Sequence, residues 1–106
     1  MAQLFDRLNQ ELETFGRRAQ AALDEGKVYI ELLRLRRQQD TAARDLGLLI
    51  HRRERGGEVE QRRIDALLLR LDDLAAEIGR LDSDLAARRR ARRAPAPAAA
   101  ASRDGT

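Results

Sequence analysis

The sequence predicts an all-α protein: an antiparallel coiled-coil helical hairpin with an additional N-terminal amphipathic helix. The first observation is the composition of the chain. Charged residues make up 37% and aromatics 3%, which is typical of long exposed helices. The second is that both prolines lie late, at Pro95 and Pro97, so no proline breaks a helix before residue 94. The third is a heptad repeat of aliphatic residues through the second half.

The first predicted element is an amphipathic helix over residues 2–25. Gly16 and Gly26 interrupt the pattern, and each costs about 1 kcal/mol relative to Ala in a helix, so we expect a bend or break before the hairpin. The apolar face has three candidate destinations: the hairpin of the same chain, a second copy of the protein, or a membrane surface. We expect its bulky residues to form the contact with a partner; they are Leu4, Phe5, Leu8, Leu12 and Phe15.

The second predicted element is the hairpin over residues 27–90, with its turn near 54–58, where Gly56 and Gly57 can end a helix. Its first helix carries seam residues at heptad positions a and d, and its second helix carries a matching set. When the chain reverses at the glycines, each facing pair joins an a to a d, and its residue numbers add up to 113. From the turn outward the pairs are Leu49/Ile64, Leu46/Leu67, Ala42/Leu71, Gln39/Leu74, Leu35/Ile78, Leu32/Leu81 and Val28/Leu85.

The two edges of this seam differ in polarity. The g positions are all polar, whereas the e positions are about half apolar, with Ile50 on one helix and Leu68 on the other. We therefore expect Ile50 and Leu68 to line an acceptor groove for a third helix. A two-helix hairpin alone is marginally stable, so such a groove needs a cover.

The third predicted element is a disordered tail over residues 91–106, rich in Arg, Ala and Pro. Just before and within it lies an arginine cluster that could contact an anionic partner; its members are Arg88, Arg89, Arg90, Arg92 and Arg93. Residues 88–106 carry a net charge of +5, whereas residues 1–87 carry −2. Nucleic-acid phosphates, an anionic membrane or an acidic protein could be attracted here, although the cluster also suits a solubilising helix end.

The sequence offers little for catalysis. There is no cysteine and His51 is the only histidine, so a zinc site lacks its usual ligands. The glycines are scattered and form no phosphate-binding loop. We therefore expect no catalytic residue, metal, cofactor or small-molecule substrate. The absence of cysteine, of a secretory signal pattern and of a long apolar run predicts a cytoplasmic protein, or one at the surface of the inner membrane.

The segments "LFDRLNQELETFG", "ALDEGKVYIELLRLRRQQ" and "ARDLGLLIHRR" resemble a group of short bacterial proteins of unknown role. Those proteins begin with a Phe-Asp-Lys-Leu-like amphipathic segment, continue into a helical hairpin and often end in a zinc ribbon. The resemblance covers residues 3–87 and implies no reaction. The zinc-ribbon cysteines are absent here, so no metal site carries over.

These features predict a non-catalytic interaction protein. It would act as a scaffold or accessory subunit that docks an apolar helix face onto a protein partner or onto itself. The alternative is a peripheral binder of an anionic membrane surface or of nucleic acid, using the arginine cluster and the N-terminal helix.

Overall fold

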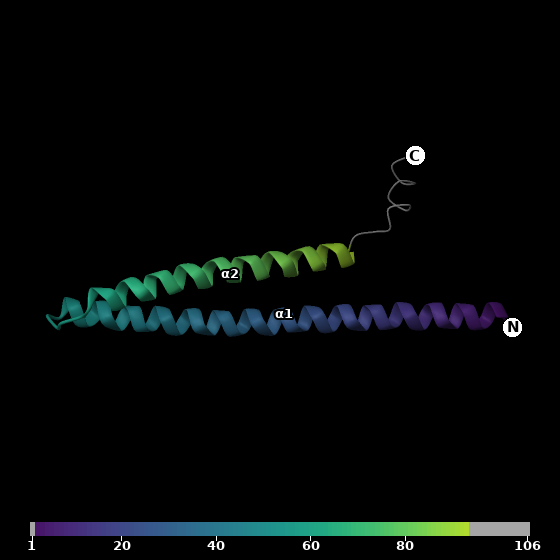
Figure 1. Ribbon diagram of the computed structural model, residues 1–106, viewed down its shortest axis with the longest axis horizontal. Coiled ribbons are helices and arrows are strands. Elements are labelled where there is room, and N and C mark those ends of the chain that lie inside the picture. Colours follow the sequence, from purple (N-terminus) through teal and green to yellow (C-terminus); the bar gives the residue numbers. More distant parts are fainter. Residues whose placement is uncertain (1, 94–106) are drawn as a thin grey trace, which may run out of the picture.

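The computed structural model describes residues 2–93, which form two long helices, α1 (Ala2–Glu54) and α2 (Gln61–Arg93). The helices lie side by side and run in opposite directions, so the molecule is a helical hairpin (Figure 1). Residues 2–93 contain no strand. The predicted all-α hairpin is confirmed.

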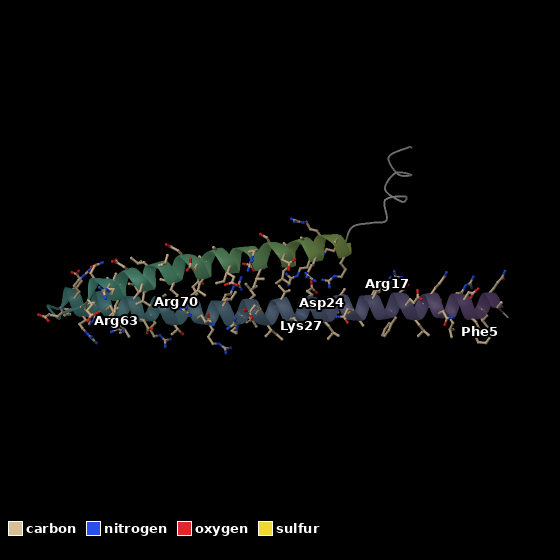
Figure 2. All side chains as sticks on the ribbon, viewed as in Figure 1. Phe5, Arg17, Asp24, Lys27, Arg63 and Arg70 are labelled. Atoms are coloured by element: carbon tan, nitrogen blue, oxygen red, sulfur yellow. The ribbon has the colours of Figure 1, made fainter. Side chains whose placement is uncertain are left out.

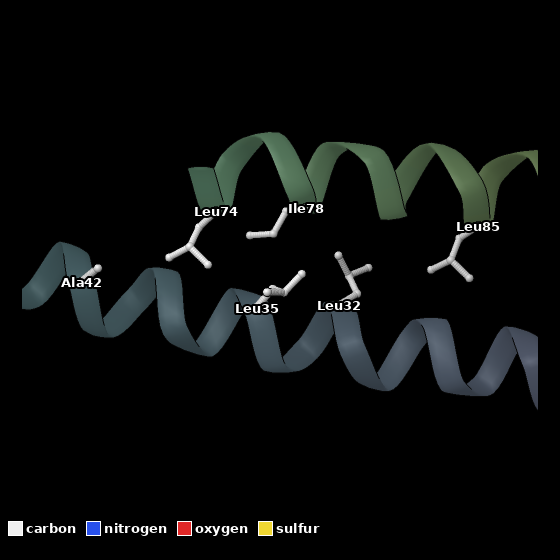
Figure 3. Packing of buried hydrophobic residues seen from close by; sticks show 6 residues of the cluster. All are labelled: Leu32, Leu35, Ala42, Leu74, Ile78 and Leu85. Atoms are coloured by element: carbon white, nitrogen blue, oxygen red, sulfur yellow. The ribbon is translucent and has the colours of Figure 1, made fainter. Parts of the chain in front are cut away.

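The core of the hairpin is the predicted seam. Within residues 2–93, the eight buried side chains are all apolar seam residues: Leu32, Leu35, Ala42, Leu49, Ile64, Leu74, Ile78 and Leu85. The remaining apolar seam positions are half-buried, as is Gln39, the polar layer. Figure 3 shows side chains from the two helices pointing toward one another along the contact. Burial of aliphatic side chains from both helices is therefore what holds the hairpin together.

The polar contacts on the two edges give the register independently of the core. If the numbers of facing a and d residues add up to 113, the numbers of opposed e residues must add up to 118. Those of opposed g residues must add up to 108. An ion pair joins Arg36 and Asp82, both at e, with 3.1 Å between Nη2 and Oδ2. A hydrogen bond joins Arg70 and Gln38, both at g, at 3.3 Å. Both pairs match the predicted register.

The chain reverses over residues 55–60, overlapping the predicted turn. Gly56 has a φ of 88°, a left-handed conformation that favours glycine. The amide of Gly57 donates to the carbonyl of Arg52 at 2.9 Å, and the amide of Gly56 donates to Arg53 at 3.0 Å. This pair of bonds is the Schellman motif, which satisfies carbonyl groups left free at a helix end.

The expected break between the N-terminal segment and the hairpin is not present. Residues 2–25 are the first part of α1, which continues through Gly16 and Gly26 without interruption. The expectation was wrong because single glycines weaken a helix but keep every backbone hydrogen bond, unlike proline. As a result the N-terminal segment does not fold back, and it projects beyond the end of α2 (Figure 1).

The other boundary is also shifted. The hairpin was expected to end at residue 90, but α2 continues to Arg93, so Arg92 and Arg93 belong to the helix. Arginine and alanine are both strong helix formers, and the first proline comes only at Pro95. The remainder of the predicted disordered tail, residues 94–106, lies outside the described residues.

Candidate interaction site

The N-terminal part of α1 has no neighbouring helix within the described chain. In the 113 register Arg93, the last residue of α2, lies level with Gln20, so residues 2–19 project past it. At 1.5 Å per residue this segment, the overhang, is about 27 Å long. Figure 2 shows Phe5 near the tip of the overhang and Arg17 closer to the hairpin.

The overhang exposes bulky apolar side chains. The five residues expected to contact a partner are all exposed, from 53% for Leu8 to 72% for Phe15. Side chains of this size leave on the order of 100 Å² each in water, so together they lie toward the upper end of the roughly 300–600 Å² usual for a monomer's largest apolar patch. Apolar patches of this size are often functional, so the overhang is a candidate interaction site.

The exposed apolar residues form a second heptad pattern. It begins at Phe5 and runs to Leu33, advancing by three and four residues alternately, one position away from the hairpin seam. We name this set the second seam; its members are Phe5, Leu8, Leu12, Phe15, Ala19, Ala22, Gly26, Tyr29 and Leu33. All are exposed except Gly26, which is half-buried. These nine positions on one continuous helix have the three-and-four spacing that is typical of a coiled-coil seam.

Of this set, only Phe5, Leu8, Leu12 and Phe15 were predicted from the sequence to contact a partner, and Gly26 was taken as an interruption. The signal was present in the spacing, because Gly26 falls on a seam position and Tyr29 and Leu33 continue the phase. What concealed it was the assumed break, since phase is preserved only along an unbroken helix.

The expected acceptor groove does not meet the overhang within one chain. Ile50 is half-buried and Leu68 is 46% exposed, and both occupy e positions on the same edge, near the turn. Phe15 precedes Ile50 by 35 residues of a straight helix, which is about 50 Å. Of the three candidate destinations for the N-terminal apolar face, the groove of the same molecule is therefore excluded.

The arginine cluster is partly engaged by acidic neighbours. Arg92 Nη1 lies 2.8 Å from Glu25 Oε2, and Arg89 Nε lies 3.9 Å from Glu25 Oε1, so the ends of the two helices are linked. Arg88 pairs with Asp84 within α2 at 3.3 Å. Among residues 2–93, Arg90 and Arg93 make no ion pair with an acidic side chain.

A groove lies where α1 and α2 separate. It has a volume of about 720 Å³, and alanines from both helices form much of its wall, namely Ala21, Ala22 and Ala91. Arg18, Glu25, Arg88 and Arg92 complete the lining. We name it the fork groove. It lies beside the second seam, which includes Ala22.

Other polar features are ordinary surface contacts. Arg34 donates two hydrogen bonds to Glu31, and this contact holds the pKa of the Glu31 carboxyl below its ordinary value. His51 is exposed at the end of α1. Residues 2–93 contain no group of three His, Asp or Glu side chains arranged to hold a metal ion. Neither described helix has a stretch long and apolar enough to cross a bilayer.

The exposed second seam, the fork groove and the partly paired arginines therefore form the candidate site. No family model matches the chain, and comparisons with curated proteins and with solved structures find no match either.

Proposed function

We propose that this protein is a non-catalytic interaction module, a scaffold or accessory subunit that docks through the apolar face of its overhang onto a protein partner or onto itself. The observation that carries the proposal is the second seam, a coiled-coil pattern on a straight helix whose residues 2–19 have no helix beside them. A surface of this type takes another helix, because a/d side chains insert between residues of a facing helix.

The energetics of the overhang support this proposal. Most of the stability of a helix in a protein comes from packing of an apolar face rather than from the intrinsic propensity of its residues. The overhang gains no such packing from α2, while it exposes both phenylalanines of the chain. Docking would bury these side chains, each contributing roughly 1.5–3 kcal/mol.

The contacts of the arginine cluster favour protein docking over binding to anionic polymers or membranes. Three of the five arginines already face carboxylates, which reduces their attraction for phosphates. The acidic and basic residues of the overhang are also mixed, with Asp6, Glu11 and Glu13 beside Arg7, Arg17 and Arg18. A helix that adsorbs to anionic lipid usually has a predominantly basic polar face.

The test is disruption of the face without disruption of the hairpin. Phe5→Asp and Leu8→Asp place a charge in the second seam, far from the buried core. We expect each variant to lose association, measured by light scattering over a range of concentrations and by affinity capture, while the hairpin melts as before. Gln10→Asp is the matched control, because Gln10 is an exposed residue of the same helix outside the seam.

The proposal fails if wild type and both seam variants have the same mass at every concentration and capture the same proteins. Association that disappears on deleting residues 88–106, and that weakens steeply with salt, would instead favour the anionic-partner alternative.

A further inference from the structure

We propose that the occupant of the second seam is the same segment of a second copy of this chain, running antiparallel, with facing seam residues whose numbers add up to 34. This inference rests on the proposed docking function and names its partner and register. The contact is isologous, so each copy supplies the same surface to a two-fold axis near Arg17. Phe5 of one copy then faces Tyr29 of the other.

The distribution of side-chain size along the second seam favours this antiparallel register. Four bulky residues from Phe5 to Phe15 come first, the small residues Ala19, Ala22 and Gly26 follow, and the seam ends with the bulky Tyr29 and Leu33. In the 34 register each of three bulky residues faces a small one: Leu8 faces Gly26, Leu12 faces Ala22 and Phe15 faces Ala19. A parallel, in-register dimer would instead set Phe15 against Phe15 and Gly26 against Gly26. Alternating large and small residues across a contact fills space evenly, which close packing requires.

Charges at the edge of the contact favour the same register. Glu11 and Arg18 flank the second seam at equivalent g positions, both are exposed, and neither makes an ion pair within residues 2–93. Antiparallel g positions face each other, and in the 34 register their numbers add up to 29. Glu11 of each copy therefore faces Arg18 of the other, giving two ion pairs related by symmetry.

The neighbouring registers lack this complementarity. Shifting by one heptad to a sum of 27 sets Glu11 against Glu11, and a sum of 41 sets Arg18 against Arg18. The parallel arrangement places Glu11 beside Gly16 and gives no charge pair. Like charges facing each other destabilise a coiled coil and select against the wrong alignment, so the charges choose the same register as the side-chain sizes.

The fork groove also suits a second copy in this register. Leu4 is 66% exposed and lies one position before the second seam, on the edge that faces α2. In the 34 register Leu4 of the second copy lies level with Glu25, which lines the fork groove. The alanines of this groove provide an apolar surface for it beside α2. The second copy therefore accounts for Leu4, an exposed residue outside the heptad pattern.

Charge reversal tests the pairing directly. Glu11→Arg would set Arg against Arg18, and Arg18→Glu would set Glu against Glu11, so we expect each variant to self-associate on the order of tenfold more weakly in sedimentation at low salt. Mixing the two variants restores two opposite-charge pairs, so the mixture should form a heterodimer close to wild-type affinity. The double variant, which carries both Glu11→Arg and Arg18→Glu, should also self-associate close to wild-type affinity, because each introduced arginine then faces an introduced glutamate. Glu13→Arg, outside the g edge, is the control.

Spin labels test direction and register. Cysteines can be placed at Gln3, Gln10 and Arg17, since the chain has none and these positions are exposed on the side of α1 away from the second seam. The axial separation between equivalent labels should be about 42 Å at Gln3, about 21 Å at Gln10 and near zero at Arg17. A parallel dimer would give one distance at all three positions.

The outcomes separate this inference from the proposed function. A monomeric wild type that binds another protein through Phe5 and Leu8, or a dimer with three equal label distances, overturns the antiparallel pairing but leaves the docking function standing. Charge-reversed variants that do not pair on mixing overturn the register. Seam variants with no effect on any association overturn both.

Discussion

At the scale of single residues, the hairpin depends on a few aliphatic side chains. Leu35 is 3% exposed and faces Ile78 in the seam. Leu35→Ala removes buried methyl groups and leaves a cavity, so we expect a loss of about 2–5 kcal/mol in the free energy of unfolding. Because a hairpin of this size has little stability to lose, thermal melting followed by circular dichroism should show an early or absent transition.

The control for this change is Leu69→Ala, which removes the same atoms from a side chain that is 62% exposed. It should change the free energy of unfolding by less than about 1 kcal/mol. Equal effects at the two positions would contradict the assignment of the seam.

A second residue-scale prediction concerns Glu31. Its carboxylate accepts hydrogen bonds from Arg34, which lowers its pKa below the ordinary value of 4.5. A lowered pKa in the folded state stabilises the protein above the unfolded pKa, and this contribution is lost as the pH falls through the folded value. NMR titration of the side-chain carboxyl should show the low pKa, and Arg34→Gln should return it toward 4.5. Arg37→Gln, which removes an arginine that does not contact Glu31, should leave it low.

At the scale of elements, the end of α1 depends on one backbone conformation. Gly56 has a φ of 88°, which costs other L-residues roughly 1–2 kcal/mol, so Gly56→Ala should lower the free energy of unfolding by about that amount. Gly47 lies inside α1, and a Cβ there would meet nothing within 4 Å. Gly47→Ala should therefore raise stability, by up to about 1 kcal/mol. Denaturant unfolding of the two variants would show opposite shifts in midpoint.

The elements also show how far the sequence determines this fold. The hairpin seam and its register were predictable, because seven layers of facing residues and a glycine pair leave one way to align the helices. The N-terminal boundary was not, because a glycine such as Gly26 carries the same local cost whether a helix bends or continues there. Once α1 is known to be straight, the second seam follows from spacing alone. The side of α1 on which the fork groove lies could not be predicted from the sequence, because the groove is formed by the packing of α1 against α2.

At the scale of the whole molecule, the overhang should be the least stable part. The overhang has no tertiary packing in a single copy. At low protein concentration we therefore expect the backbone amide hydrogens of residues 5–18 to exchange much faster than those of residues 32–49. Raising the concentration should slow exchange in the overhang, since binding stabilises the bound conformation by mass action. Residues 32–49 provide the internal control, with protection that depends little on concentration. Strong protection of the overhang in a dilute monomer would contradict the need for a partner.

The unequal length of the two helices has a geometric consequence. Because α1 extends well past α2, two copies joined through their overhangs would carry their glycine turns at opposite poles of one rod. From the two-fold axis near Arg17 to Arg55 is 38 residues, so the poles would stand about 115 Å apart, against about 80 Å for the length of α1 alone. Such an object is a molecular spacer: whatever attaches at the two turns would be held apart at a fixed span set by helix length.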